Sequence, residues 1–206
     1  MDLIYRLFIQ FPILLFSITI HEFAHGFMSN KLGDDTGSVM GRLTLNPMAH
    51  IDLIGTIILP LISIVTGAPV FGWAKPVPIN PYRLNNPKRD MMLIGLAGPV
   101  SNMLMALLAG LAIKVFGTID SMAFSLPLFQ YLLVLNIILA VFNLVPIPPL
   151  DGSHIVSGLL PSRWAYEYEK LGQYGFFILI FLLMSGVLWN ILGPIVVILM
   201  KFMGGS

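Results

Sequence analysis

The sequence predicts an all-α polytopic membrane protein with about four transmembrane helices, a re-entrant segment and a small β-hairpin at the membrane surface. Of its 206 residues, 57% are hydrophobic and only 10% are charged, and its mean hydropathy is +0.88. A soluble domain carries roughly a quarter charged residues. A helix needs about 20 apolar residues to cross a bilayer, and three uncharged runs exceed that length: residues 91–113, 121–150 and 174–200.

The first predicted span covers residues 3–30 and is expected to be retained in the mature protein. It resembles a signal peptide only in its apolar core, because it lacks a basic leading region and a cleavage site with small residues. The other spans are predicted at about 91–117, 126–146 and 173–203. No polar interval is long enough for a separate soluble domain, so residues 1–206 are expected to form one intramembrane domain.

Residues 41–90 are predicted to form a re-entrant and hairpin region. Within it, residues 53–66 are apolar but too short to cross the bilayer comfortably, and Gly55 and Pro60 interrupt them. Interrupted, partly non-helical backbone is tolerated at membrane depth only where other parts of the protein cover it. Residues 71–82 contain several prolines, which forbid a continuous helix and favour an extended hairpin.

The distribution of basic residues predicts the orientation in the membrane. Lys and Arg recur in residues 29–90 and 151–172, whereas the loop at 117–127 carries only Asp120. Cytoplasmic loops are the ones enriched in Lys and Arg, so the first two regions are placed in the cytoplasm. Arg6, Lys114 and Lys201 would then lie near the outer ends of spans, against this trend. The protein is expected in the cell membrane with its active site toward the cytoplasm.

The end of the first span carries a metal-binding motif with the sequence HEFAH, at residues 21–25. His21 and His25 are one helical turn apart on the same face, so both can bind one Zn²⁺, with Glu22 beside the metal as a base. The alternative is a pair of buried histidines with ordinary hydrogen bonds. Three ionisable groups at membrane depth are expensive unless they are paired or functional, which favours the metal site.

A catalytic zinc site usually has three protein ligands, and the sequence contains no cysteine to provide the third. Asp151 is the strongest candidate because the prolines before it must unwind the chain at the end of an apolar run. Spacing alone leaves an equal alternative, in which Asp151 caps a short helix. His50 and Asp52 are expected to fix a loop by hydrogen bonds instead.

Together these segments resemble the site-2 protease family of intramembrane zinc metalloproteases, in the compact branch without a PDZ domain. The resemblance rests on HEFAH at 21–25, NLVPIPPLDG at 143–152, GPVSN at 98–102, GRLTLNPMAHIDLIGT at 41–56 and FGWAKPVPINPYRLNNPKRD at 71–90. Leu53 departs from the pattern, since proline is expected there. That difference concerns the re-entrant segment and not the metal motif.

The resemblance implies one Zn²⁺ per chain, held by His21, His25 and Asp151, with Glu22 as the general acid–base. It also implies that the substrate is a transmembrane or membrane-associated protein, cleaved within or near its membrane helix. The residues expected to contact substrate are Asn143, Asn102, Pro146, Val77 and Ile79. The last two would act by pairing the 71–82 hairpin with an unwound substrate strand.

A divalent-metal transporter that uses the same His and Asp cluster is the main alternative function. A transporter would need ionisable groups at several depths in several spans, whereas these lie at the ends of two segments. The lipid bilayer is an expected partner. A net charge of +1 gives no indication of nucleic-acid binding, and none is expected. The sequence does not fix the oligomeric state.

Overall fold

The structure is a computed structural model that describes residues 5–66 and 72–204. The start of the first predicted span (residues 3–4) and residues 67–71 of the predicted hairpin region lie outside the described residues. Contacts divide the chain into two compact units, Met1–Asn85 and Asn86–Ser206. We call them the N-terminal unit and the C-terminal unit. The single domain expected from the sequence remains a prediction.

The N-terminal unit is built on one long helix. A π-helical turn, η1 (Arg6–Gln10), continues into α2 (Phe11–Lys31), and the 26 residues together are long and apolar enough to cross a membrane. Gly33 follows with a φ of 107°, which favours glycine and turns the chain away from the helix axis. Two short elements follow, α3 (Thr36–Val39) and η2 (Pro47–His50). Over its described residues the first predicted span is therefore helical, and its place in the membrane stays a prediction.

The next apolar stretch forms two short helical pieces. These are η3 (Leu53–Ile58), of 6 residues, and α4 (Leu59–Thr66), of 8 residues. Asp52 is the N-cap residue of η3, and its side chain accepts hydrogen bonds from the backbone N–H groups of Ile54 and Gly55. At 1.5 Å per residue the two pieces reach only about 21 Å, short of the ~30 Å hydrocarbon core. Their length fits a re-entrant segment better than a span.

The predicted β-hairpin is not supported by the structure. Among the described residues of this region, 72–80 are extended but form no strand, and they lead into the 3₁₀ turn η4 (Pro81–Arg83). Pro76 and Pro78 have no N–H to offer a partner strand. The backbone N–H groups of this segment instead bond to the carbonyls of His50 and Gly55 and to carboxylate side chains of the same unit.

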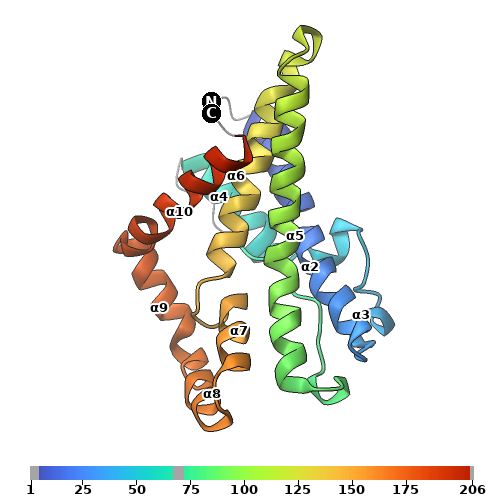
Figure 1. The fold of residues 1–206 in the computed structure, drawn as a ribbon, viewed down its shortest axis with the longest axis vertical. Helices are drawn as coiled ribbons and strands as arrows, with labels where there is room; N and C mark the ends of the chain where they lie inside the picture. Colours follow the sequence, from blue (N-terminus) through green and yellow to red (C-terminus); the bar gives the residue numbers. More distant parts are fainter. Residues whose placement is uncertain (1–4, 67–71, 205–206) are drawn as a thin grey trace. The chain divides into compact units, whose positions relative to one another are not determined.

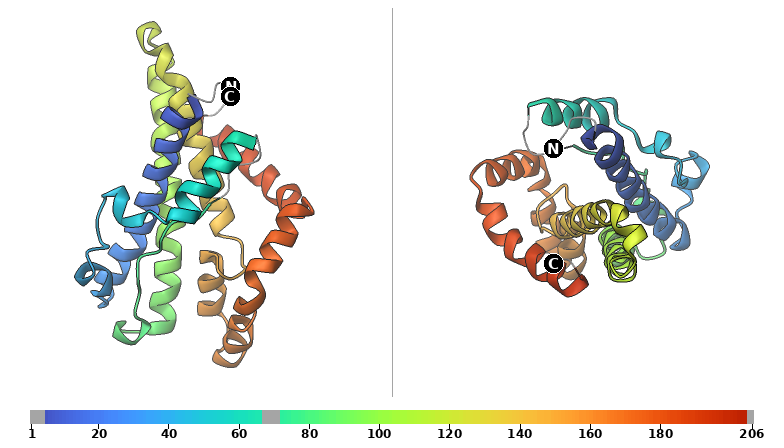
Figure 2. Two further views of the ribbon diagram at one scale, coloured as in Figure 1. Left: turned by 180° about the vertical axis from the view of Figure 1, so that it is seen from behind. Right: turned by 90° about the horizontal axis from the view of Figure 1, so that it is seen from above.

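The C-terminal unit is centred on two helices that lie side by side, α5 (Pro87–Phe116) and α6 (Leu126–Asn143) (Figures 1 and 2). The short η5 (Asp120–Ser125) connects them. Small residues of α5 such as Ala106 and Ala109 are buried in the core of this unit, where they allow close packing of helices. Both helices are long and apolar enough to be the spans predicted at 91–117 and 126–146, although α6 ends at Asn143, ahead of the prolines.

Two short helices follow α6, namely α7 (Asp151–Leu159), which packs on α5, and α8 (Ser162–Glu169). The predicted span at 173–203 is not one straight helix. It consists of α9 (Gly172–Met184) and α10 (Val187–Met203), bent by 74° at a break where Gly186 has a φ of 73° (Figure 2). The described chain thus has three helices able to cross a membrane, or four if this bent pair is one span.

Candidate active site

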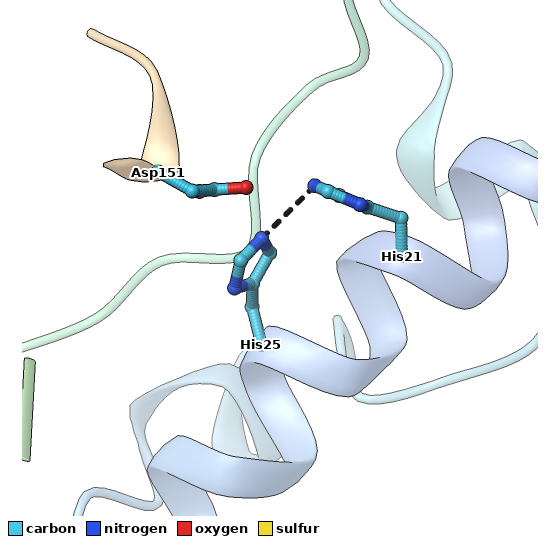
Figure 3. Close-up of side chains that lie close together, drawn as sticks. All are labelled: His21, His25 and Asp151. Atoms are coloured by element: carbon cyan, nitrogen blue, oxygen red, sulfur yellow. Dashed lines mark hydrogen bonds between the residues drawn. The ribbon is translucent and has the colours of Figure 1, made fainter. Parts of the chain in front are cut away.

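The two histidines of α2 face one another at the end of the first membrane span. His21 and His25 are both buried, and their Nε2 atoms lie 3.1 Å apart (Figure 3). Two imidazole nitrogens that bind one tetrahedral zinc, at the usual Zn–N distance, lie about 3.3 Å apart. The pair therefore fits a zinc ion without rearrangement of the helix. Regular α-helical geometry produces this arrangement, since residues i and i+4 share a face.

Glu22, between these histidines in sequence, is held by a distant part of the N-terminal unit. Its Oε2 atom accepts a hydrogen bond of 3.1 Å from the backbone N–H of Val77. A carboxylate has two oxygens, so this bond fixes the orientation of the group and leaves the second oxygen for chemistry. Glu22 is therefore oriented in the way that a general base requires.

The 72–80 segment that provides this N–H is anchored on both sides of Val77. The backbone N–H of Lys75 donates to the carbonyl of His50 at 2.9 Å, and that of Asn80 donates to the Asp34 carboxylate at 2.7 Å. Arg42 adds hydrogen bonds to the carbonyls of Lys75 and Pro76. The segment is thus part of the fixed surroundings of Glu22.

Asp34 is a buried carboxylate that joins three pieces of the N-terminal unit. It accepts hydrogen bonds from the Ser29 hydroxyl, from the N–H and hydroxyl of Thr36, and from the N–H of Asn80. Burial by itself raises the pKa of the Asp34 carboxyl, but these hydrogen bonds outweigh it and lower the pKa below its ordinary value. Asp34 therefore favours its charged form, which is the form that accepts all of these donors.

His50 and Asp52 have the loop-fixing role that the sequence predicts. The buried His50 ring bonds through Nε2 to the carbonyl of Thr44 at 2.9 Å. Asp52 accepts from the N–H groups of Ile54 and Gly55 at the start of η3. Both side chains are thus engaged in shaping the turns on either side of η2.

In the C-terminal unit, Asp151, which is labelled in Figure 3, is the first residue of α7. It is half-buried. The N-cap residue of α7 is Leu150, and Asp151 already lies within the helix. The alternative role, in which Asp151 is the N-cap residue, is therefore not what the structure has. Gly95 of α5 allows the two helices to approach closely, because a Cβ there would lie 3.0 Å from the Asp151 carbonyl oxygen. His154, one turn along α7, is exposed.

The predicted substrate contacts lie in different surroundings. Asn102 is fully buried and donates to the Asn136 side chain at 2.8 Å, which joins α5 to α6. Asn143 donates to the Leu139 carbonyl at 2.9 Å, and the exposed Pro146 lines an apolar cavity of about 440 Å³ in the C-terminal unit. In the N-terminal unit, the Val77 side chain is buried and Ile79 is half-buried. Substrate binding by these five residues stays a prediction.

Sequence reasoning missed several residues that shape the site. Asn136 is the buried partner of Asn102, and its signal in the sequence was an amide side chain in the middle of an uncharged span. The role of Asp34 in joining three pieces of the N-terminal unit has no distinct signal in the sequence. The hydrogen bond from Val77 to Glu22 crosses a long stretch of chain and depends on tertiary structure alone.

Comparison with known proteins identifies the family. YwhC of Bacillus subtilis (strain 168), which is named as a zinc metalloprotease, is 38% identical over 87% of this chain and 83% of its own. The model of Peptidase family M50 matches residues 110–186. The chain belongs to peptidase family M50, the site-2 proteases. The matched stretch includes Asp151 but ends before α10.

Two mycobacterial relatives agree with the M50 assignment. Rip2 of Mycolicibacterium smegmatis is 30% identical over 84% of this chain and 66% of its own, and Rip2 of Mycobacterium tuberculosis (strain H37Rv) is 31% identical over 82% and 62%. Both are named as zinc metalloproteases. No solved structure matches the chain significantly. This M50 peptidase is a multi-pass membrane zinc metalloprotease, and the family favours an enzyme over the transporter alternative.

Proposed function

We propose that this M50 peptidase cleaves peptide bonds within or near the transmembrane helices of membrane-protein substrates, as a step of regulated intramembrane proteolysis. The observation that carries the proposal is the position of the HEFAH motif. Its two facing Nε2 atoms, 3.1 Å apart, belong to a helix that is long and apolar enough to cross a membrane. A metal site on such a helix acts where lipid-embedded substrates reside.

In the proposed site, His21, His25 and Asp151 hold the zinc ion. The donor set of two imidazoles and a carboxylate is a common one for catalytic zinc and leaves a position for water. When bound, zinc polarises the scissile carbonyl and lowers the pKa of a water molecule. The support for Asp151 is the NLVPIPPLDG motif of the family and its place at the start of α7, outside the N-cap position.

Glu22 carries the proton transfers in this proposal. The oxygen that does not accept from Val77 takes a proton from the attacking water and then delivers it to the leaving amide nitrogen. The bond between the carbonyl carbon and that nitrogen breaks, while a new bond forms from the water oxygen to the carbonyl carbon. Glu22 thereby returns to its carboxylate form after each cycle.

The substrate must be unwound before hydrolysis, since a helical peptide bond is shielded by its own hydrogen bonds. The proposed contacts are Asn143, Asn102 and Pro146 in the C-terminal unit and Val77 and Ile79 in the N-terminal unit. The exposure of Pro146 and the adjoining apolar cavity support a surface that receives an apolar chain. The active site is proposed to open toward the cytoplasm, because the basic loops are the ones near the catalytic motifs.

Cleavage in proteoliposomes tests the proposal. The purified protein is reconstituted with a single-span model substrate, and mass spectrometry locates the cut. We expect a cut within or next to the apolar segment, loss of activity with a zinc chelator, and loss in Glu22→Gln with about one zinc per chain retained. Cleavage only in soluble tails, or full activity in Glu22→Gln, would contradict the proposed function.

A further inference from the structure

The side chain of Val77 is enclosed between two glycines of the N-terminal unit. It is 4% exposed, and a Cβ built on Gly26 or on Gly37 would lie 2.9 Å or 2.7 Å from its Cγ1 atom. Cβ atoms do not approach other heavy atoms so closely, so this space exists only because both positions are glycine. Gly26 belongs to α2, next to His25, and Gly37 belongs to α3.

The backbone of Val77 is fixed as firmly as its side chain. Its neighbours Pro76 and Pro78 have restricted φ angles and offer no competing N–H. The N–H groups of Lys75 and Asn80 are bonded to the His50 carbonyl and to the Asp34 carboxylate. Between these two anchored residues, the Val77 N–H donates to Oε2 of Glu22 at 3.1 Å.

We propose that Val77 is a positioning residue for Glu22: the glycine-lined space locks its side chain, and its backbone amide then sets the orientation of the catalytic carboxylate. The inference rests on the proposed role of Glu22 as general base. A catalytic group must be held closely to its productive geometry, and a displacement of about 1 Å can reduce the rate on the order of 100-fold. Because the bond from Val77 fixes Oε2 of Glu22, it also sets the direction of the second carboxylate oxygen.

The proposed mode of action differs from strand pairing between the 71–82 region and substrate. In strand pairing, the backbone at both Val77 and Ile79 would serve the substrate, so proline at either position would impair cleavage. In positioning, the bond that matters is the Val77 N–H to Glu22, whereas Ile79 makes no such bond to that carboxylate. Val77→Pro, which removes this N–H, should therefore reduce kcat at least 10-fold.

The first test uses Gly37→Ala, which places a methyl group against Val77 Cγ1. We expect kcat to fall about 10- to 100-fold with KM and zinc content unchanged, because the amide moves away from Glu22. In Gly37→Ala/Val77→Ala the clashing Cγ1 is absent, so kcat should return to that of Val77→Ala alone. Gly193→Ala in α10 is the matched control, since a Cβ there meets nothing within 4 Å, and its kcat should equal wild type.

A second variant keeps the test decisive if Gly37→Ala does not fold. Replacing the Val77 residue by its α-hydroxy acid converts one amide to an ester, which removes the N–H and retains every side chain. We expect a kcat at least 10-fold lower with zinc still bound. Wild-type kcat in the ester variant, or a Gly37→Ala loss that Val77→Ala does not rescue, overturns the positioning role.

The same assay separates this inference from the proposed function. Cleavage by wild type and its loss in Glu22→Gln establish the function independently of Val77. If Glu22→Gln stays active, the proposed function fails. If Glu22→Gln is inactive while the ester variant and Gly37→Ala keep wild-type kcat, only the positioning inference fails.

Discussion

The end of α2 and the start of α7 provide their proposed zinc ligands in different ways. His21 and His25 stand on a regular helix, and helical periodicity alone makes their Nε2 atoms face one another. Asp151 follows a proline-rich turn, and its position in the C-terminal unit depends on close packing around α7. The comparison teaches that a ligand pair can be a local property, whereas a single ligand from a turn depends on distant packing.

The packing around α7 depends on glycines whose Cα atoms lie close to backbone atoms of other segments. A Cβ on Gly152 would lie 2.2 Å from the Leu144 carbonyl oxygen, and one on Gly175 of α9 would lie 1.8 Å from that of Pro148. Backbone cannot move aside as the end of a flexible side chain can. The Asp151 region should therefore tolerate a single added methyl group much less well than the exposed surface of α2.

The largest expected effect comes from the ligands themselves. Asp151→Asn and His25→Ala should each reduce zinc from about one per chain to well below half, and abolish cleavage, because two remaining ligands hold zinc weakly. Metal analysis of the detergent-purified proteins measures this without any substrate. Zinc retained in Asp151→Asn but lost in His25→Ala would break the comparison, since the α7 residue would then not be a ligand.

The next effect tests how far the α7 ligand depends on packing. Gly152→Ala should destabilise the protein by about 1–3 kcal/mol, because the added Cβ forces backbone apart, and should weaken zinc binding as Asp151 shifts. Thermal unfolding and competition with a chelator report the two quantities.

Gly172→Ala is the matched control for Gly152→Ala, since its Cβ would make only an ordinary 3.7 Å contact with Pro148. Its stability should lie within about 0.5 kcal/mol of wild type. Equal behaviour of the two variants would show that packing does not set the Asp151 position.

A smaller effect concerns Asp34 and the anchoring of the 72–80 segment. The pKa of Asp34 is lowered in the folded protein by hydrogen bonds, against the opposing effect of burial. Its stabilising contribution is present above the unfolded pKa of about 3.9 and is lost as pH falls through the lower folded value. Amide exchange at Asn80 should therefore accelerate, after correction for intrinsic rates, below about pH 4.

Asp34→Asn provides the control for this acid effect. Its Asn80 amide should exchange rapidly at every pH, with no acid step. Both wild type and Asp34→Asn are treated with a chelator beforehand, so that zinc release in acid does not contribute to the exchange rates. An acid step of equal size in Asp34→Asn would assign the effect to another carboxyl group.

The smallest effect is expected from the ion pair between Arg83 and Asp35 in the N-terminal unit, whose side chains are 51% and 54% exposed. Exposed pairs of this kind contribute about 0.2–1 kcal/mol and are screened by salt. Arg83→Ala should therefore lower the melting temperature only slightly, and the difference should disappear at high salt. A large, salt-independent loss would mean that the 72–90 region depends on this residue for packing.

Sequence reasoning succeeded where the signal is local. The long apolar runs predicted the helices at the first, second and third spans, and the length of 53–66 predicted a segment too short to cross. It failed at the hairpin, because Pro76 and Pro78 suggested extended chain but not what that chain bonds to. It did not foresee the bend within 173–203, where hydropathy is continuous but the chain turns by 74° near Gly186 into a second helix.

The sequence by itself determined the membrane class, the family and the pairing of His21 with His25, because hydropathy and helical period act over neighbouring residues. Only the tertiary structure decided what holds Glu22 and how Asp34 fastens the 72–80 segment. Those bonds join residues far apart in the chain. Every residue except proline has the same backbone N–H group, so the sequence does not show which of these groups will bond to a given carboxylate. Their partners are chosen by the fold, since a buried donor must find an acceptor wherever packing brings one.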